Sequence, residues 1–312
     1  MITDGAVMLD ITLLGCGGTM PLPNRWLTSL LVRYKGRNIL IDAGEGTQIA
    51  LKQAGLSAHD IDLILITHFH GDHVMGLPGI LMSMGTSGRT EPVTIVGPKG
   101  LLEIVPKLCV VAGIPFEVMG HELSGRKEEF DVPGFTELHV HAFRVSHSVE
   151  TWGYSLVLDR AGRFNADAAK ALNIPLKYWN RLQKGEEIDC EEGHFTPGMV
   201  MGPPRKGLKV TYTTDSRPCE SIKEAAENAD LFVCEGMYGD DEKLYAAALK
   251  KHMTFSEAAH IAEEAQPKQM WLTHYSPSEQ DPEYWMEQTR NIFPETYPGF
   301  DGKTGTLKYD AE

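Results

Sequence analysis

Four apolar runs in this chain are each followed closely by a histidine or an aspartate. The run from Ile61 to Ile66 is rich in Ile and Leu and predicts a buried strand. Runs at 138–145, 209–213 and 269–273 predict three more strands that end in the same way. One polar residue after a strand is weak evidence, because strand ends often carry polar side chains. Four such endings favour convergence on one centre, since the ends of strands gather at one edge of a layered sheet.

Helix signals separate these strands, so strands and helices alternate along the chain as in an α/β protein. Thr254 and Glu257 form a capping-box pattern, and Asp281-Pro282 is a typical N-cap with proline at the first helical position. A hairpin is predicted around Lys35-Gly36. The predicted helices cover residues 47–54, 100–112, 258–265 and 283–292, with a further helix opening at Pro78.

The segment 159–204 interrupts this alternation of strands and helices. It contains a predicted helix at 165–173 and then the basic residues Arg181 and Lys184. We interpret it as an inserted arm and not as a separate domain, within one domain that covers residues 1–312. A solvated lid without a binding partner explains the same composition equally well.

The strand at 61–66 leads into the pattern HxHxDH, which places four metal-ligand residue types within six positions. His68 and His70 are two positions apart and can face the same way from an extended segment. Gly71 then allows a tight turn that returns Asp72 and His73 toward the same point. Imidazoles with a carboxylate suit zinc and similar divalent ions, and imidazole and carboxylate ligands also accept manganese or iron.

The strand-end residues complete a set of seven ligands that divides between two metal ions. The first ion takes His68, His70 and His147, the second takes Asp72, His73 and His274, and Asp215 bridges them. Two ions about 3.5–4 Å apart hold a bridging hydroxide and stabilise an in-line displacement at phosphorus. The pattern therefore predicts metal-hydroxide attack on a phosphodiester.

Three further residues are assigned catalytic roles. Asp72 can also orient the hydroxide, and His252, paired with Glu235, is the candidate proton donor for the leaving 3′ oxygen. Spacing alone favours an exposed histidine at a helix entry for His252. Asp42 and Glu45 are interpreted as loop-structuring carboxylates. The remaining histidines are given no functional role: His59, His121, His139, His141, His194 and His260.

Composition narrows the class of protein and its partners. The chain has 312 residues, 42% of them hydrophobic and 23% charged, as expected of a globular protein. Its net charge of −14 makes it a poor general polyanion binder, so a nucleic acid must be held by a local basic patch or by metal. The five scattered cysteines indicate reduced thiols in a cytoplasmic protein. No signal peptide or membrane-spanning run is expected.

Several longer segments match a known family. They are Leu14–Thr19 with Pro21 and Arg25, Asp42–Gln48, Gly71–Gly79, His147–Glu150 leading to Gly153-Tyr154, and His252–Thr254. With the HxHxDH run, His147, Asp215 and His274, they resemble the metallo-β-lactamase superfamily and, within it, ribonuclease Z, the tRNA 3′-processing endonuclease. The resemblance runs nearly from end to end.

The resemblance implies an α/β fold with four αββα layers, two zinc ions and precursor tRNA as substrate. It also implies a homodimer in which the arm of one subunit binds tRNA held at the active site of the other. His252 would work with Glu235, although Cys234–Met237 replaces the family's His-Glu-Ala-Thr.

The leading hypothesis is therefore a zinc-dependent endoribonuclease that removes 3′ trailers from precursor tRNA. The alternative is a metallo-hydrolase of a small phosphodiester or other ester on the same fold. A redox protein is disfavoured, because such relatives need a glutamate where this chain has His70. An inactive RNA-binding scaffold is disfavoured by the full ligand set.

Overall fold

The computed structural model describes residues 8–310, which form two compact units. Of the described residues, 8–157 and 208–310 belong to the larger unit, and Leu158–Gly207 form the smaller one. The segment 159–204, which the sequence marks as an insertion, lies within the smaller unit.

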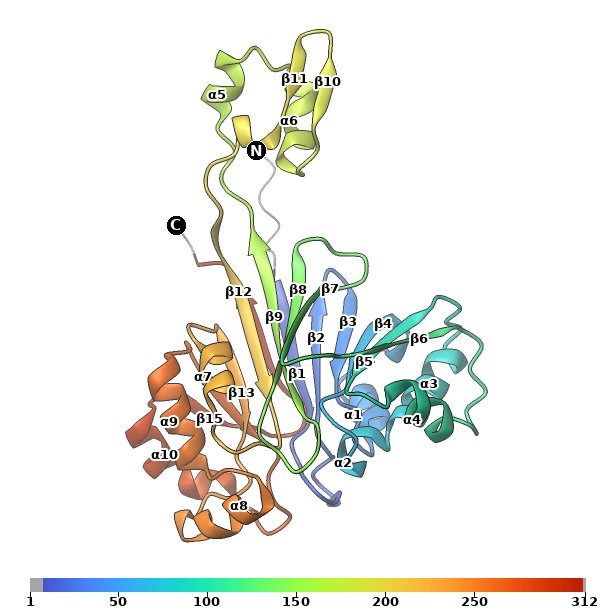
Figure 1. The fold of residues 1–312 in the computed structure, drawn as a ribbon, viewed down its shortest axis with the longest axis vertical. Helices are drawn as coiled ribbons and strands as arrows, with labels where there is room; N and C mark the ends of the chain where they lie inside the picture. Colours follow the sequence, from blue (N-terminus) through green and yellow to red (C-terminus); the bar gives the residue numbers. More distant parts are fainter. Residues whose placement is uncertain (1–7, 311–312) are drawn as a thin grey trace. The chain divides into compact units, whose positions relative to one another are not determined.

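The first sheet of the larger unit has seven strands in the order β16-β1-β2-β3-β4-β5-β6 (Figure 1). The strands β1, β2 and β3 run antiparallel, while β3 to β6 run parallel. Lys35 and Gly36 have φ values of +47° and +83°, as a tight two-residue hairpin turn requires. The bounds are β1 Met8–Gly15, β2 Ser29–Tyr34, β3 Arg37–Ile41, β4 Ile61–Leu65, β5 Val93–Gly97, β6 Val118–Glu122 and β16 Lys303–Lys308.

The second sheet also has seven strands, in the order β15-β14-β13-β12-β9-β8-β7. Its strands β12 to β15 are parallel, and β7 pairs antiparallel with β8. The bounds are β7 Lys127–Asp131, β8 Leu138–Arg144, β9 Trp152–Arg160, β12 Arg205–Thr213, β13 Leu231–Glu235, β14 Met270–Thr273 and β15 Thr296–Pro298.

Helices cover the outer face of each sheet, which makes four layers. Figure 1 shows α1, α3 and α4 beside the first sheet and α7, α9 and α10 beside the second. The predicted four-layer α/β sandwich is therefore confirmed. The bounds are α1 Thr47–Gln53, α2 Gly71–Val74, α3 Leu77–Thr86, α4 Leu101–Leu108, α7 Glu220–Ala226, α8 Leu244–Lys250, α9 Phe255–Ala265 and α10 Met286–Ile292. Single 3₁₀ turns lie at η1 Ala58–Asp60, η3 Asp241–Lys243 and η4 Pro282–Trp285.

Buried apolar side chains hold the helices against the first sheet, and hydrogen bonds link the two sheets near the ligand-bearing strand end. A cluster of buried side chains from β3, β4, β5 and the helices α1, α3 and α4 forms the outer core of the first sheet. The two sheets are joined next to the HxHxDH segment, where the Tyr154 hydroxyl donates to the Ile66 carbonyl at 2.6 Å. The Trp152 amide donates to the Thr67 carbonyl at 3.0 Å in the same region. The backbone that leads into the motif is thus held by the second sheet.

The smaller unit has an apolar core of its own. It contains α5 Ala166–Ala171, α6 Leu176–Gln183, the hairpin of β10 Ile188–Cys190 and β11 Gly193–Phe195, and η2 Pro197–Met199. Its buried residues include Ile174, Leu182 and Phe195. The helix predicted at 165–173 corresponds to α5, whereas α6 was not predicted.

The helix signals located the predicted helix boundaries to within about three residues, except for one helix end. Thr254 and Glu257 form both bonds of the predicted capping box. The helix expected at 100–112 ends at Leu108, and exposed Val110 and Val111 follow it. Two β-branched residues with solvent-facing side chains gain no burial that would prolong a helix. Among residues 8–310, no helix combines the length and hydrophobicity that crossing a bilayer requires.

Candidate metal centre

The seven predicted ligands meet at one edge of the two sheets. His68 and His70 follow β4 in extended backbone, and the short helix α2 returns Asp72 and His73 to the same place. The other three come from loops after β8, β12 and β14. His68, His73, Asp215 and His274 are each 2% exposed or less. Buried polar groups of this kind require partners, because leaving water without them is costly.

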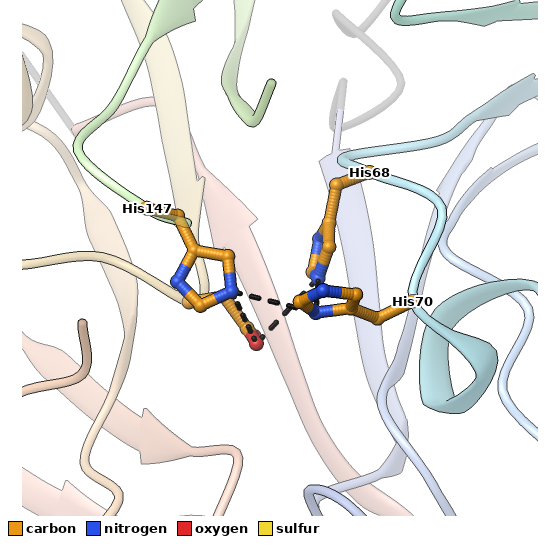
Figure 2. Close-up of side chains that lie close together, drawn as sticks. His68, His70 and His147 are labelled. Carbon is orange, nitrogen blue, oxygen red and sulfur yellow. Dashed lines mark hydrogen bonds and ion pairs between the residues drawn. The ribbon is translucent and has the colours of Figure 1, made fainter. Parts of the chain in front are cut away.

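Three imidazoles form the first group, and Figure 2 shows them turned toward one another. His70 Nδ1 lies 2.9 Å from His68 Nε2 and 3.4 Å from His147 Nε2. Oδ2 of Asp215 lies 3.6 Å from His68 Nε2 and 3.7 Å from His147 Nε2. One ligand atom from each of these four residues lies within 4.8 Å of every other.

The second group contains Asp72, His73 and His274. Oδ2 of Asp72 lies 3.6 Å from His73 Nε2 and 3.4 Å from His274 Nε2. Oδ1 of Asp215 lies 3.2 Å from His73 Nε2 and 2.9 Å from His274 Nε2. The two oxygens of Asp215 therefore face different groups, as a bridging carboxylate must.

Two of these residues adopt backbone conformations that non-glycine residues rarely take. Asp215 has a φ of +41° and His274 a φ of +58°. Such conformations cost of order 1 kcal/mol or more and persist where the surrounding structure imposes them. At both positions the turn directs a side chain from a strand end into the shared cluster.

The donor set fits divalent cations. Nε2 of His73 and Nε2 of His274 are buried and form no hydrogen bond within the described residues. They lie close to carboxylate oxygens, but in geometry that does not satisfy a hydrogen bond. Ligand atoms about 2.1 Å from a tetrahedral cation are separated by about 3.4 Å. The separations of 2.9–3.7 Å within each group match that spacing.

A second layer of hydrogen bonds orients the ligands. Asp42 is fully buried and lies 2.8 Å from His73 Nδ1, while the Thr67 amide donates to it at 2.8 Å. The sequence indicated only a loop-structuring role for Asp42, and this contact was not predicted. Its place directly after the buried strand β3 was a usable signal. His147 Nδ1 lies 3.0 Å from the Lys251 carbonyl, and the Thr19 amide donates to Asp72 at 2.6 Å. Partners of this kind fix ring orientation and tautomer.

Electrostatics favour the metal-binding forms of His68 and Asp215, whereas the Asp215 carboxylate outweighs burial and raises the pKa values of His73 and His274. Burial lowers the pKa of His68 well below its usual range, so the ring is neutral. Burial alone would raise the pKa of Asp215. The neighbouring charges of His274 and His73 outweigh it and hold that pKa well below its usual value. The bridging position therefore carries a carboxylate.

His252 and Glu235 lie beside the first group. His252 is 9% exposed, so the exposed position that spacing alone favours is wrong. Its Nδ1 lies 3.1 Å from Oε2 of Glu235, which is fully buried at the end of β13, and 4.0 Å from Oδ2 of Asp215. Burial would lower the pKa of His252, but the Glu235 carboxylate beside it raises that pKa. The pair can hold a proton next to the metal groups.

The six histidines given no functional role lie outside the cluster. Each is paired with an acidic neighbour: His59 with Asp60, His121 with Glu128, His139 with Asp131, His141 with Glu129, His194 with Asp189, and His260 with Glu263. Local ion pairs account for all six.

Known proteins resemble this chain over nearly its whole length. Ribonuclease Z of Agathobacter rectalis is 53% identical over 98% of this chain and 100% of its own. Ribonuclease Z of Lachnospira eligens is 50% identical over the same shares. Residues 9–184 match the family model for the anti-Pycsar protein Apyc1, and residues 179–275 match that for the beta-lactamase superfamily domain. The crystal structure of the short form of human tRNase Z superposes with a TM-score of 0.68 at 24% identity, covering 95% of this chain and 98% of that one.

Proposed function

This chain belongs to the ribonuclease Z family of the metallo-β-lactamase superfamily, and we propose that it removes 3′ trailers from precursor tRNA by hydrolysis at the metal centre. The observation that carries the chemistry is Asp215, whose two oxygens face two separate groups of ligand atoms. A shared carboxylate between two such groups is the arrangement of two-metal phosphodiester hydrolysis.

We assign two zinc ions to the centre. His68, His70 and His147 would hold the first, Asp72, His73 and His274 the second, and Asp215 both. Manganese or iron would suit the same imidazole and carboxylate ligands. When bound, such ions lower the pKa of a water molecule toward neutrality and offset negative charge that develops at phosphorus.

The residues around the centre then have separate tasks. Asp72 is the most exposed member of the second group, with 11% of its side chain exposed, and the Thr19 amide fixes its carboxylate, so it is placed to orient the attacking water. His252 donates a proton to the leaving 3′ oxygen, and Glu235 stabilises the protonated ring. Protonation matters because a ribose alkoxide is a poor leaving group.

We assign tRNA binding to the smaller unit. Residues 158–207 contain eight Lys and Arg against seven Asp and Glu, whereas the whole chain contains 29 against 43. Lys177 and Arg181 on α6 and Lys184 directly after it are exposed and, at spacings of four and three residues, share one face, on which Arg181 pairs with Glu186 at 2.7 Å. Five of the seven acids lie in residues 186–192. The α6 face is therefore the part of this unit suited to phosphates.

We further propose a homodimer in the cytoplasm. Ile49, Met75 and Met82 are 44–56% exposed on and next to helices α1 to α3, and they supply apolar surface that a partner subunit could cover. All five cysteines are free, as in proteins of reducing compartments. Light scattering at micromolar concentration tests the dimer, and a monomer would contradict it.

The function is tested by comparing two substrates on the zinc-loaded protein. Precursor tRNA with a 3′ trailer should be cut at the end of the mature tRNA, and bis(p-nitrophenyl) phosphate should be hydrolysed at the same centre. Hydrolysis of the small ester alone would reject tRNA processing in favour of the small-phosphodiester alternative. The absence of both activities in a protein that binds two zinc ions would reject the assignment entirely.

A further inference from the structure

Arg217 joins three of the loops that build the catalytic centre. It lies two residues after Asp215, and its amide donates to the Ser146 carbonyl at 2.9 Å, next to His147. Its guanidinium donates to the main-chain carbonyl of His252 at 2.5 Å. Nothing in the HxHxDH pattern marks this residue, and no direct contact to the ligand cluster accounts for it.

The guanidinium of Arg217 is in turn held by a carboxylate. It forms a two-pronged ion pair with Glu257, with one N–O distance of 2.9 Å. Glu257 is the third residue of α9 and closes the capping box with Thr254. The Arg217 and Glu257 side chains are only 21% and 19% exposed, so water screens the pair weakly. The helix α9 therefore braces the arginine against the His252 carbonyl.

The main chain beside His252 is held on both sides, because the Lys251 carbonyl lies 3.0 Å from His147 Nδ1 and the Met253 carbonyl accepts from the Met237 amide at 3.0 Å. The His252 amide donates to the Ala247 carbonyl at 2.9 Å, and the preceding residue, Lys251, has a φ of +62°. The ring contacts Glu235 through one nitrogen and packs against the rings of His147 and His274, at centroid distances of 5.2 and 5.5 Å. Arg217 holds the carbonyl of His252 itself, and a planar fork with several donors is suited to fixing a main-chain group.

We propose that Arg217 is a positioning residue: it holds the main chain of His252 so that the imidazole stays aligned with the leaving oxygen. This inference rests on the proton-donor role assigned to His252 in the proposed function. Arg217 acts through His252, and its amide joins the loops of Asp215 and His147. Its side chain should therefore matter for protonation of the leaving group and not for metal binding.

The test uses two substrates that differ in their need for protonation. A ribose 3′ oxygen leaves slowly without an acid, whereas p-nitrophenolate is a stable anion that leaves unaided. Arg217→Met should lower kcat on precursor tRNA by about 10- to 100-fold, because small misalignments of a general acid cost that much. Its kcat on bis(p-nitrophenyl) phosphate should change by less than about threefold, with KM for tRNA and zinc content unchanged.

Arg217→Lys keeps a positive charge opposite Glu257 but offers one nitrogen in place of a fork. It should recover part of the lost kcat, and it also serves as the test variant if Arg217→Met does not fold. In a His252→Ala background, Arg217→Met should cause no further loss on precursor tRNA, because the two residues act as one unit.

Arg290 supplies the matched control. It donates to the Thr296 carbonyl at 3.0 Å and pairs with Glu283 at 3.1 Å, in α10 away from the ligand set. Arg290→Met removes bonds of the same kinds and should leave the ratio of the two activities unchanged. A change in that ratio as large as that of Arg217→Met would overturn the inference.

The outcomes separate the two proposals. If His252→Ala leaves cleavage of precursor tRNA intact, the proton-donor role fails and the role of Arg217 fails with it. If His252→Ala is impaired but both Arg217 variants match the wild type, only the positioning role fails. Equal losses on both substrates would assign Arg217 to folding or metal binding and would also reject the proposal.

Discussion

We expect that a single methyl group added at Gly18 disturbs the metal centre. A Cβ atom added there would lie 2.6 Å from Cε1 of His274 and 2.8 Å from both of its ring nitrogens. Ordinary contacts between carbon atoms are about 3.5–4.0 Å. The Gly18→Ala substitution therefore requires a displacement of about 1 Å on one side of this contact.

Neither side can move freely. The Gly18 amide donates to the Tyr275 carbonyl at 2.9 Å, which holds the glycine against the segment that carries His274. The His274 ring is buried, and its Nε2 lies 2.9 Å from Oδ1 of Asp215. Metal–ligand distances tolerate deviations of about 0.2 Å, so a 1 Å shift exceeds that tolerance several-fold.

Gly18→Ala should therefore weaken the second metal site and lower kcat on both substrates by about 10²-fold, which corresponds to about 2.7 kcal/mol in the barrier. Zinc bound per chain should fall from two toward one by elemental analysis of the dialysed protein. Gly113→Ala is the control, because a Cβ there meets nothing within 4 Å. A Gly18→Ala protein with wild-type kcat and two zinc ions would refute this account of the site.

Four further predictions follow from other parts of the structure. His68→Ala should lose metal and both activities together, and an inactive variant with full metal content would contradict its ligand role. His252→Ala should keep its metal and lose about 10²- to 10⁴-fold on precursor tRNA but little on bis(p-nitrophenyl) phosphate; equal losses on the two substrates would exclude a proton donor. Replacing residues 158–207 with a short turn should raise KM for precursor tRNA and leave small-ester hydrolysis unchanged; an unchanged KM would remove the smaller unit from tRNA binding. Arg89→Met should lower the free energy of unfolding, measured in urea, by about 3 kcal/mol, because Arg89 is 1% exposed and pairs with Asp62 at 2.9 Å. A loss below about 0.5 kcal/mol would show that the buried pair adds no stability.

Local sequence determined the elements that carry the ligands. The apolar run before His68 is a strand because its Ile and Leu side chains have two buried faces to fill. The capping box at Thr254 starts α9 where the pattern places it, because both of its bonds lie within one helical turn. The metal-ligand types at strand ends were visible for the same reason, since a strand end is a local feature.

Tertiary structure decided which oxygen or nitrogen faces which neighbour. The sequence assigned Asp215 as the bridge, but the way its two oxygens face the two groups depends on a left-handed turn after β12 and on the neighbouring loops of the second sheet. Asp42 and Arg217 were missed for the same reason. Asp42 contacts a residue 31 positions away, and Arg217 contacts one 35 positions away. Each pair comes together only when the chain folds.

The sequence by itself thus determined the strand-and-helix order and the chemical types available at the strand ends, since both depend on burial patterns within a few residues. The tertiary structure alone decided the distances within each group of ligands, the support of His252 and the separate core of the smaller unit. These depend on distances between residues far apart in the chain, and only the packed fold sets such distances.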